Sequence, residues 1–390
     1  MSSKPIIKTC LQILPSLGTG GVERGTIDMA QALVREGWRA LVASEGGPRL
    51  RELERTGAEH FVLPLATKSP LRMWLNSKQL AELISNQSID IVHARSRAPA
   101  WSAHWAKNSI EFPLITTFHG TYSRGLLGLK KPYNRIMTLG TPTIAVSDFI
   151  ANYIANEYEV DESIIQTIYR GIDTEVFDPR SVTPARIIDL AKKWRLPDGG
   201  PIVMLPGRLA SWKGHALVAD ALSILKSSNG MPEGWRCLMV GPSSEGSAYR
   251  SRLESYIESH GVGGDIQIIE DCRDMAAAYM VADVVISAST RPEAFGRIVA
   301  EAQAMGRPVV APAHGAAQEI MLPGVTGWLF TPGDAKSLAG AIRRAATLKK
   351  GMREDLADRA REHVINHFSK KNMTDKTLKI YESMIYQSGK

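Results

Sequence analysis

The sequence predicts an α/β protein made of two doubly wound halves, each a parallel sheet covered by helices on both faces. Three observations predict this class. Short apolar runs alternate with helical patterns along most of the chain. The alternation stops near Pro179 and Pro184, which mark a domain boundary, and then restarts. The length of 390 residues also exceeds what a single core usually supports.

The charge and hydropathy of the chain limit its classes of partner. The net charge is +7, from 47 basic and 40 acidic residues, and favours an anionic partner such as a nucleotide or a phospholipid. The sequence has neither zinc-finger spacing nor an aromatic-basic RNA-binding run, so we do not expect nucleic acid. It has no apolar run of about eighteen residues, which argues against a transmembrane helix.

The N-terminus and the cysteines indicate a cytoplasmic protein. The apolar patch at residues 10–17 is short and contains Pro15, so we expect no signal peptide. The three cysteines, Cys10, Cys237 and Cys272, form no CxxC pair. This pattern favours a reducing compartment and argues against a structural metal site.

Seven apolar runs predict the strands of the first half: residues 8–14, 40–44, 60–65, 89–94, 114–118, 143–146 and 164–168. The first run leads into a loop with Gly20, Gly21 and Glu23, and a helical pattern follows. A strand, a glycine-rich loop and a helix form a phosphate-binding arrangement. The glycine spacing matches neither a Walker loop nor GxGxxG, so a plain tight turn fits equally well.

Polar side chains lie at the ends of several of these strands. His93 and Arg95 lie at the end of the fourth run, and His119 directly follows the fifth. Ligands of such sheets bind outside the carboxyl ends of the strands, so we expect these residues at one rim with the glycine loop. For each histidine, a hydrogen-bonded packing role remains the alternative.

The segment 122–131 mixes basic and apolar residues. It contains Tyr122, Arg124, three leucines and two lysines, and with Arg95, Arg97 and Arg135 it would give the first half a basic, apolar rim. Such elements bind membrane interfaces. A solvated loop with one packing anchor explains the segment equally well.

Six further runs predict the strands of the second half: residues 201–205, 237–240, 266–269, 284–287, 308–311 and 326–330. Gly207 and Arg208 follow the first of them, and Lys213 lies at the predicted start of the next helix. An arginine fork and a lysine charge beside bare backbone suit a diphosphate, with two ordinary surface cations as the alternative. Gly241 and Cys272 follow the second and third strands.

The most informative stretch follows the fourth of these strands. Glu293 lies in a turn, and Glu301 lies eight residues later, about two helical turns away. Gly296 lets a backbone approach a ligand closely, and a helix N-terminus binds anions. Two carboxylates beside an anion site suit a nucleotide sugar. A solvated glutamate pair explains the stretch alone equally well.

Everything after Asp334 is predicted to be helical. In the last helix, at residues 368–387, Leu378, Tyr381 and Ile385 recur at spacings of three and four and form one apolar face. This face must dock on another part of the protein.

Together these motifs resemble the GT-B glycosyltransferases, specifically the large retaining group called family 4, over essentially the whole chain. The most specific motif is the E-x7-E pair of Glu293 and Glu301, followed by G-R-x4-K-G at residues 207–214 and G-G-x-E at residues 20–23. The motif T-F-H-G with His119 also fits, as do residues 171–179 and 324–330.

The resemblance implies two Rossmann-like domains that face each other across a cleft. They would comprise residues 1–178 and 179–367, with a final helix in residues 368–390 packed on the first domain. The chain departs from the family at Ala294, where glycine is frequent, and at Arg297, where an apolar residue is usual. The second departure would alter what lies near the sugar or the phosphate.

The resemblance also implies residue roles. The catalytic candidates are His119, Glu293, Arg208 and Lys213: the two cations would neutralise the departing diphosphate, and Glu293 and His119 would bind the transferred sugar. Glu301 would accept hydrogen bonds from the ribose. The donor-binding candidates are Gly20, Gly21, Gly207, Arg208, Lys213, Gly241, Cys272, Glu293, Ala294, Phe295, Gly296, Arg297, Ile298 and Glu301. The acceptor-side candidates are Glu23, Arg95, Tyr122 and Arg124.

The implied activity is transfer of a hexose, such as mannose, from a GDP- or UDP-hexose with retention of configuration. The acceptor would be an oligosaccharide or glycolipid, such as lipopolysaccharide core, at the cytoplasmic face of the inner membrane. No Asp-x-Asp motif follows a strand, so neither a metal nor a cofactor is implied. The alternatives are a nucleotide-sugar epimerase and a non-catalytic binding protein; the intact motifs argue against both.

Overall fold

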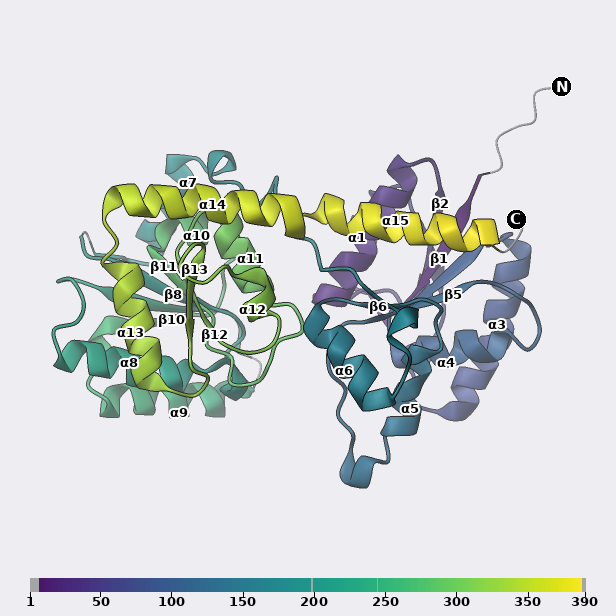
Figure 1. Ribbon diagram of the computed structural model, residues 1–390, viewed down its shortest axis with the longest axis horizontal. Coiled ribbons are helices and arrows are strands. Elements are labelled where there is room, and N and C mark those ends of the chain that lie inside the picture. The colour runs from purple at the N-terminus through teal and green to yellow at the C-terminus, as the bar shows by residue number, and fades with distance from the viewer. Residues whose placement is uncertain (1–6, 198, 244, 388–390) are drawn as a thin grey trace. The chain divides into compact units, whose positions relative to one another are not determined.

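The computed structural model describes residues 7–197, 199–243 and 245–387. Its contacts divide the chain into two units. The first unit comprises the residues up to Gly171 together with those from Lys370, and the second comprises Ile172–Ser369. Each unit contains one parallel sheet with helices on both faces (Figure 1). The predicted doubly wound α/β class is confirmed.

The sheet of the first unit has seven parallel strands in the order β3-β2-β1-β4-β5-β6-β7. Every strand predicted in this half is present. The strands are β1 (Thr9–Ile13), β2 (Arg39–Ser44), β3 (Glu59–Val62), β4 (Ile91–Ala94), β5 (Leu114–Phe118), β6 (Thr143–Ala145) and β7 (Ile165–Thr167). The α-helices are α1 (Gly21–Arg35), α2 (Leu50–Glu54), α3 (Pro70–Asn86), α4 (Arg97–Ala106), α5 (Lys131–Arg135), α6 (Asp148–Tyr158) and α15 (Lys370–Gln387).

The sheet of the second unit has six parallel strands in the order β10-β9-β8-β11-β12-β13. All six predicted strands are present. They are β8 (Ile202–Pro206), β9 (Arg236–Val240), β10 (Ile266–Ile269), β11 (Val284–Ile286), β12 (Val309–Pro312) and β13 (Gly327–Phe330). The α-helices are α7 (Pro184–Lys193), α8 (His215–Ser227), α9 (Gly246–Ser259), α10 (Met275–Val281), α11 (Arg297–Ala304), α12 (Ala317–Ile320), α13 (Ala335–Ala346) and α14 (Lys350–Phe368).

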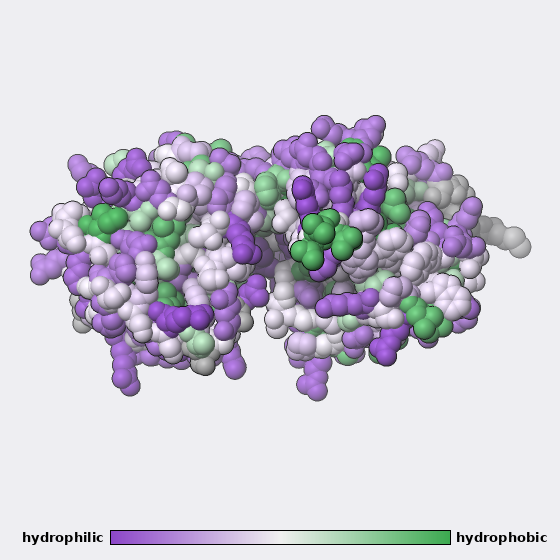
Figure 2. Space-filling model, turned by 90° about the horizontal axis from the view of Figure 1, so that it is seen from below, coloured by the Kyte–Doolittle hydropathy of each residue, from purple (hydrophilic) through white to green (hydrophobic). Residues whose placement is uncertain are grey.

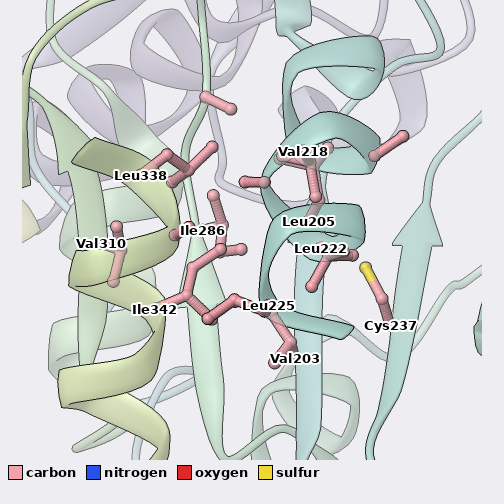
Figure 3. Packing of buried hydrophobic residues seen from close by; sticks show 14 of the residues in the cluster. Val203, Leu205, Val218, Leu222, Leu225, Cys237, Ile286, Val310, Leu338 and Ile342 are labelled. Carbon is pink, nitrogen blue, oxygen red and sulfur yellow. The ribbon is translucent and has the colours of Figure 1, made fainter. Parts of the chain in front are cut away.

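The core of the second unit shows why these runs fold as they do. Strand β11 is buried at every position because helices cover both faces of the sheet. Val218, Leu222 and Leu225 recur on α8 at spacings of four and three, and form the face that meets the strands (Figure 3). On α13, Leu338 and Ile342 have the same spacing and enter the same core. The helical spacing of these apolar residues therefore corresponds to the buried face of each helix.

Helix α15 completes the core of the first unit. It contacts α1 and β4, and Leu378, Tyr381 and Ile385 are buried there. The apolar face predicted from their spacing therefore docks on the unit that contains the start of the chain. The helix begins at Lys370 rather than at Phe368, because Ser369 has extended dihedral angles of φ −74° and ψ 152°.

Each sheet has one point at which the strand order reverses. This switch point lies between β1 and β4 in the first unit and between β8 and β11 in the second. Ligands of doubly wound sheets bind outside the carboxyl ends of the strands at such a point. The two switch points therefore locate the candidate sites.

Candidate functional site

The candidate site of the second unit lies at the carboxyl ends of β8 and β11. Gly207 follows β8, and α11 begins shortly after β11. A Cβ atom at Gly207 would lie 3.5 Å from Cδ1 of Ile298, so the start of α11 packs against the end of β8. Lys213 and Glu293, which are 80 residues apart in sequence, form a hydrogen bond here. The two most specific motifs therefore meet in one place.

Two cations lie at the end of β8. Arg208 is exposed, and it makes no hydrogen bond or ion pair with any residue in the described ranges. Lys213 places Nζ 2.7 Å from Oε1 of Glu293 and 4.4 Å from the ring centroid of Trp212. Lys213 was predicted to begin a helix. It instead ends a short 3-10 turn, Ser211–Lys213, and α8 starts at His215 after Gly214 adopts a left-handed conformation.

Glu293 is held in its turn by both its side chain and its backbone. Oε1 accepts hydrogen bonds from Lys213 and from the hydroxyl of Ser289, whereas Oε2 has no partner among the described residues. The backbone amide of Ala316 donates to the carbonyl of Glu293 at 3.1 Å. A Cβ atom at Gly315 would lie 2.8 Å from the amide nitrogen of Glu293, so only glycine fits here. Oε2 therefore keeps its full capacity to accept hydrogen bonds.

Glu301 is nearly buried, with 9% of its surface exposed, and two residues bind its carboxylate. The hydroxyl of Tyr279 donates to Oε2 at 3.0 Å. Arg297 donates to Oε1 from Nε at 3.2 Å and from Nη2 at 3.0 Å. Arg297, the unusual residue of this motif, therefore orients Glu301 from one helical turn away. A carboxylate has about four acceptor sites, so Glu301 can still bind hydroxyl groups.

Several other donor-binding candidates form the frame of this site. Gly296 caps α11 with φ +77°, a conformation that favours glycine, and Ala294 is partly buried in the turn before it. Phe295 is 3% exposed and packs edge-on against Phe368, with ring centroids 6.0 Å apart. A Cβ atom at Gly241 would overlap the carbonyl oxygen of Gly207. The side chain of Phe295 and the missing side chain of Gly241 therefore serve packing.

Cys272 lies between β10 and α10 and is partly buried. Its Sγ lies 3.4 Å from the carbonyl oxygen of Asp274. Burial raises the pKa of this thiol. A neutral thiol in this loop can line an apolar group but is a poor nucleophile.

The glycine loop of the first unit leads into α1. Gly20 is the N-cap residue and Gly21 is the first helical residue, without a side-chain cap. The carboxylate of Glu23 folds back, and its Oε2 would lie 2.5 Å from a Cβ atom at Gly20. A side chain at Gly20 would therefore displace the carboxylate of Glu23 from this position. The first amides of α1 can receive an anion.

His93 and His119, the two candidate histidines of the first unit, differ in their contacts. His93 is a packing residue, because its Nδ1 lies 2.5 Å from the Tyr381 hydroxyl and its Nε2 lies 2.7 Å from Thr117 Oγ1. In His119, Nδ1 lies 2.9 Å from Nη1 of Arg170, whereas Nε2 is buried without a hydrogen-bond partner in the described part of the chain. Arginine only donates, so Nδ1 accepts and the proton of the neutral ring lies on Nε2.

The surroundings of His119 keep its ring neutral. Burial and then the charges of Arg170 and Arg95 lower its pKa well below the usual 6.5. His119, Arg170 and Arg95 line a cavity of about 30 Å³, which has room for a water-sized group. His119 can therefore donate a hydrogen bond to an oxygen atom at physiological pH, but cannot act there as a cation.

The prediction that Arg95 lies on an exposed basic rim is wrong. It is 6% exposed, and its Nε donates to Oε1 of Gln12 at 2.8 Å. Strands β1 and β4 pair with Gln12 opposite His93, so the side chain of Gln12 lies within reach of Arg95. Arg95 therefore belongs to the interior beside His119 and not to the surface.

Tyr122 and Arg124 lie in the loop before α5. The guanidinium group of Arg97 lies over the Tyr122 ring, 4.3 Å from its centroid, and burial raises the pKa of the Tyr122 hydroxyl. Arg124 forms a close ion pair with the buried carboxylate of Glu157. Neither residue lines the cavity beside His119.

Sequence reasoning assigned no role to four residues that complete these sites: Arg170, Tyr279, Ser289 and His314. Ser289 lies four residues before Glu293 in the same turn, and this closeness was an available signal. Tyr279 lies on a different helix from Glu301, so no local spacing indicated their contact. His314 precedes Gly315, and neither of its ring nitrogens has a partner among the described residues.

No group of three or more histidine, cysteine, aspartate or glutamate side chains in the described residues is arranged to hold a metal ion. None of the helices described is long and apolar enough to cross a membrane.

Comparison with known proteins identifies the family of this chain. Residues 19–176 match the family "Glycosyltransferase Family 4", and residues 187–363 match "Glycosyl transferases group 1". The crystal structure of a glycosyltransferase from Rickettsia africae ESF-5 is 36% identical, with a TM-score of 0.89 over 97% of this chain and 99% of that one. Anabaena Alr3699/HepE in complex with UDP-glucose is 23% identical, with a TM-score of 0.79 over 96% of this chain and 99% of that one.

A D-inositol 3-phosphate glycosyltransferase of Mycobacterium bovis is 26% identical over 310 residues, which are 76% of this chain and 62% of that protein. The chain thus spans about six tenths of the length of this curated relative. The Rickettsia structure matches over nearly its full length at higher identity. The chain therefore belongs to the glycosyltransferases, and its two units have the GT-B fold.

Proposed function

We propose that this glycosyltransferase moves a hexose, such as mannose, from a GDP- or UDP-hexose to an oligosaccharide or glycolipid acceptor, with retention of configuration and without a metal. One observation carries the proposal: at the switch point of the second unit, Lys213 bonds to Glu293, and Gly207, the neighbour of Arg208, packs against the helix that carries Glu301. Cations suit the phosphates of such a donor, and carboxylates suit its hydroxyl groups. The complex of the Anabaena relative with UDP-glucose supports this class of donor.

The proposal gives each of these side chains a role. Arg208 and Lys213 would stabilise the charge that develops on the departing diphosphate, a role that a metal ion has in other enzymes. Glu293 would accept a hydrogen bond from a sugar hydroxyl through its unused Oε2. Glu301, oriented by Tyr279 and Arg297, would accept hydrogen bonds from the ribose.

Retention is proposed to occur on one face of the sugar. Ordinary retaining chemistry needs a carboxylate nucleophile near the anomeric carbon, and no carboxylate lines the His119 cavity in the described residues. The acceptor oxygen would bond to the anomeric carbon from the side on which the bond to phosphate breaks. The leaving phosphate oxygen would take the proton of the acceptor hydroxyl. His119 would hold a sugar oxygen by donating from Nε2.

The acceptor is proposed to be part of an envelope glycan, such as lipopolysaccharide core, at the cytoplasmic face of the inner membrane. The support is the basic and apolar loop at residues 122–131, whose leucines are exposed. The first unit would then present the acceptor, and the second unit would bind the donor.

A thermal-shift screen against UDP, GDP, ADP and their sugars tests the donor class. A ligand at 100 times its dissociation constant adds about 2.7 kcal/mol to the free energy of unfolding, which this method detects readily. Glu293→Gln should keep the nucleotide response but lose transfer, whereas Glu254→Gln on the exposed face of α9 should keep both. NMR of the product should show the anomeric configuration of the donor, with turnover unchanged in EDTA. No response to any nucleotide, or an inverted product, would contradict the proposal.

A further inference from the structure

The loop before α5 presents three leucines to solvent. Leu126, Leu127 and Leu129 are 80%, 91% and 75% exposed. Single exposed apolar residues are ordinary on protein surfaces, but three within four positions form a patch. This patch needs an explanation beyond the packing of the first unit.

The loop is ordered, so the exposure of these leucines is built into its backbone. The amide of Lys130 donates to the carbonyl of Arg124 at 2.9 Å, and Nδ2 of Asn134 donates to the carbonyl of Ser123 at 3.1 Å. Leu127 has φ +51°, a left-handed conformation that is costly for a leucine. A costly conformation that turns an apolar side chain outward indicates a binding function.

A second apolar patch lies near the start of α3. Leu71, Trp74 and Leu75 are 65%, 46% and 47% exposed, and their spacing of three and four places them on one face of the helix. Nζ of Lys78 lies 4.0 Å from the ring centroid of Trp74. An exposed tryptophan beside a lysine is typical of residues at a membrane interface.

Both patches belong to the same helical layer of the first unit. Helix α3 packs against α4, and α4 is bonded to the segment that follows the loop. Nε1 of Trp101 donates to the carbonyl of Tyr133 at 3.1 Å, and Nη1 of Arg97 donates to Asn134 at 2.7 Å. Figure 2 views the molecule from below. It shows green areas framed by purple over the loop that projects lowest in Figure 1 and again near the lower end of α3.

The charge around both patches has one sign. Residues 67–78 contain three basic residues and residues 120–135 contain four, and neither segment contains an acidic residue. Two of these cations have partners outside the segments, because Arg124 pairs with Glu157 and Lys131 pairs with Glu159. The others, which are Lys68, Arg72, Lys78, Lys130 and Arg135, form no ion pair within the described residues.

We propose that this face of the first unit docks on an anionic membrane surface, with the leucine loop and the Leu71–Trp74–Leu75 patch in the interface. The apolar side chains would enter the boundary between headgroups and acyl chains, and the unpaired cations would contact the headgroups. Neither patch has enough apolar area to hold the protein on a membrane alone, so the two patches bind the membrane together. The inference rests on the proposed function in one respect, since a lipid-linked acceptor gives the docking a purpose.

Co-sedimentation of the full chain with vesicles tests the inference. Vesicles of phosphatidylethanolamine with about one third phosphatidylglycerol should bind the protein, and vesicles of phosphatidylcholine alone should bind it much less. The variant Leu126→Ser/Leu127→Ser/Leu129→Ser should bind at least about tenfold more weakly, and so should Leu71→Gln/Trp74→Gln/Leu75→Gln. The combined variant should not sediment. Raised salt should weaken binding by the wild type.

A matched control is Ile188→Gln, which removes an apolar side chain that is 51% exposed on α7 of the second unit. It should leave vesicle binding unchanged, and all variants should keep the wild-type melting temperature and its nucleotide response. Binding that survives the combined variant would overturn the inference. A wild-type dimer that becomes a monomer in these variants on size-exclusion chromatography would also overturn it, because the patches would then join two copies of the chain. Vesicle binding without any nucleotide response would instead overturn the proposed function and leave this inference standing.

Discussion

Removal of one hydroxyl group, by Tyr279→Phe, should loosen Glu301 and weaken nucleotide binding. The Tyr279 ring is fully buried, and its hydroxyl donates at 3.0 Å to a carboxylate that is 9% exposed. Phenylalanine keeps the ring and its packing, so the change removes one hydrogen bond to a charged group. Such a bond is worth about 1.5–3 kcal/mol. The free energy of unfolding of the second unit should fall by that amount.

The fall should be visible in the melting temperature. For a domain of this size, 1 kcal/mol corresponds to about 2–4 °C, so Tyr279→Phe should lower the melting temperature by about 3–12 °C. Arg297 still holds Oε1, so Glu301 should remain in the site with less fixed geometry. The dissociation constant of the nucleotide, measured by calorimetry, should rise by roughly threefold or more, which is about 0.7 kcal/mol.

A matched hydroxyl deletion separates this effect from a general one. Tyr256→Phe removes a hydrogen bond of 2.7 Å to Asp220, which lies away from Glu301 on α8 and is 31% exposed in its side chain. It should cost less stability and leave nucleotide affinity unchanged. The reasoning is refuted if Tyr279→Phe has the melting temperature and the nucleotide affinity of the wild type. It is also refuted if Tyr279→Phe lowers both by the same amount when Glu301 is already replaced by Gln, because the effects of two contacting residues must couple.

Further predictions concern other described contacts. Lys213→Met should lower kcat at saturating donor by about a hundredfold or more, and Lys213→Arg by less, since charge on the leaving group is then unopposed. Gly241→Ala should lower expression or the melting temperature sharply because of the overlap with Gly207, whereas Gly340→Ala, with open space on α13, should not. Burial lowers the pKa of His215 to about 4. The unfolded chain therefore binds this proton more readily, and the free energy of unfolding should fall as the pH drops from 6.5 to about 4, with no contribution above pH 6.5. The melting temperature of His215→Gln should depend less on pH over that range. Ring-¹⁵N NMR should show His119 neutral with its proton on Nε2 from pH 6 to 8, and Arg170→Met should remove that preference; a protonated ring in the wild type at pH 6 would contradict the assignment.

The local features of the fold could be predicted from the sequence because local patterns carry them. The apolar run of β11 lies within the predicted residues 284–287, since a strand buried on both faces is apolar throughout. The spacing of Leu378, Tyr381 and Ile385 likewise predicted a docked face for the last helix. The order of the motifs then placed Arg208 and Glu293 at strand ends.

Contacts between distant segments could not be predicted in this way. Arg95 looked like a surface cation because strand ends are usually exposed, and only the pairing of β4 with β1 brings Gln12 to its guanidinium group. The contact of Tyr279 with Glu301 joins two helices that no spacing relates. Arg297 was an unexplained departure until its bond to Glu301, one turn away, gave it a role.

The order of synthesis gives the position of α15 a further meaning. Its side chains fill the core of the first unit, yet these residues leave the ribosome only after the whole of Ile172–Ser369. A nascent chain can therefore fold the contiguous second unit while the first, although translated earlier, still exposes the surface that Tyr381 covers beside Trp38 and His93. Of the two units, the one whose synthesis begins earlier is therefore completed later, and a chain that stops short of Lys370 would leave the apolar surface under Tyr381 open to chaperones.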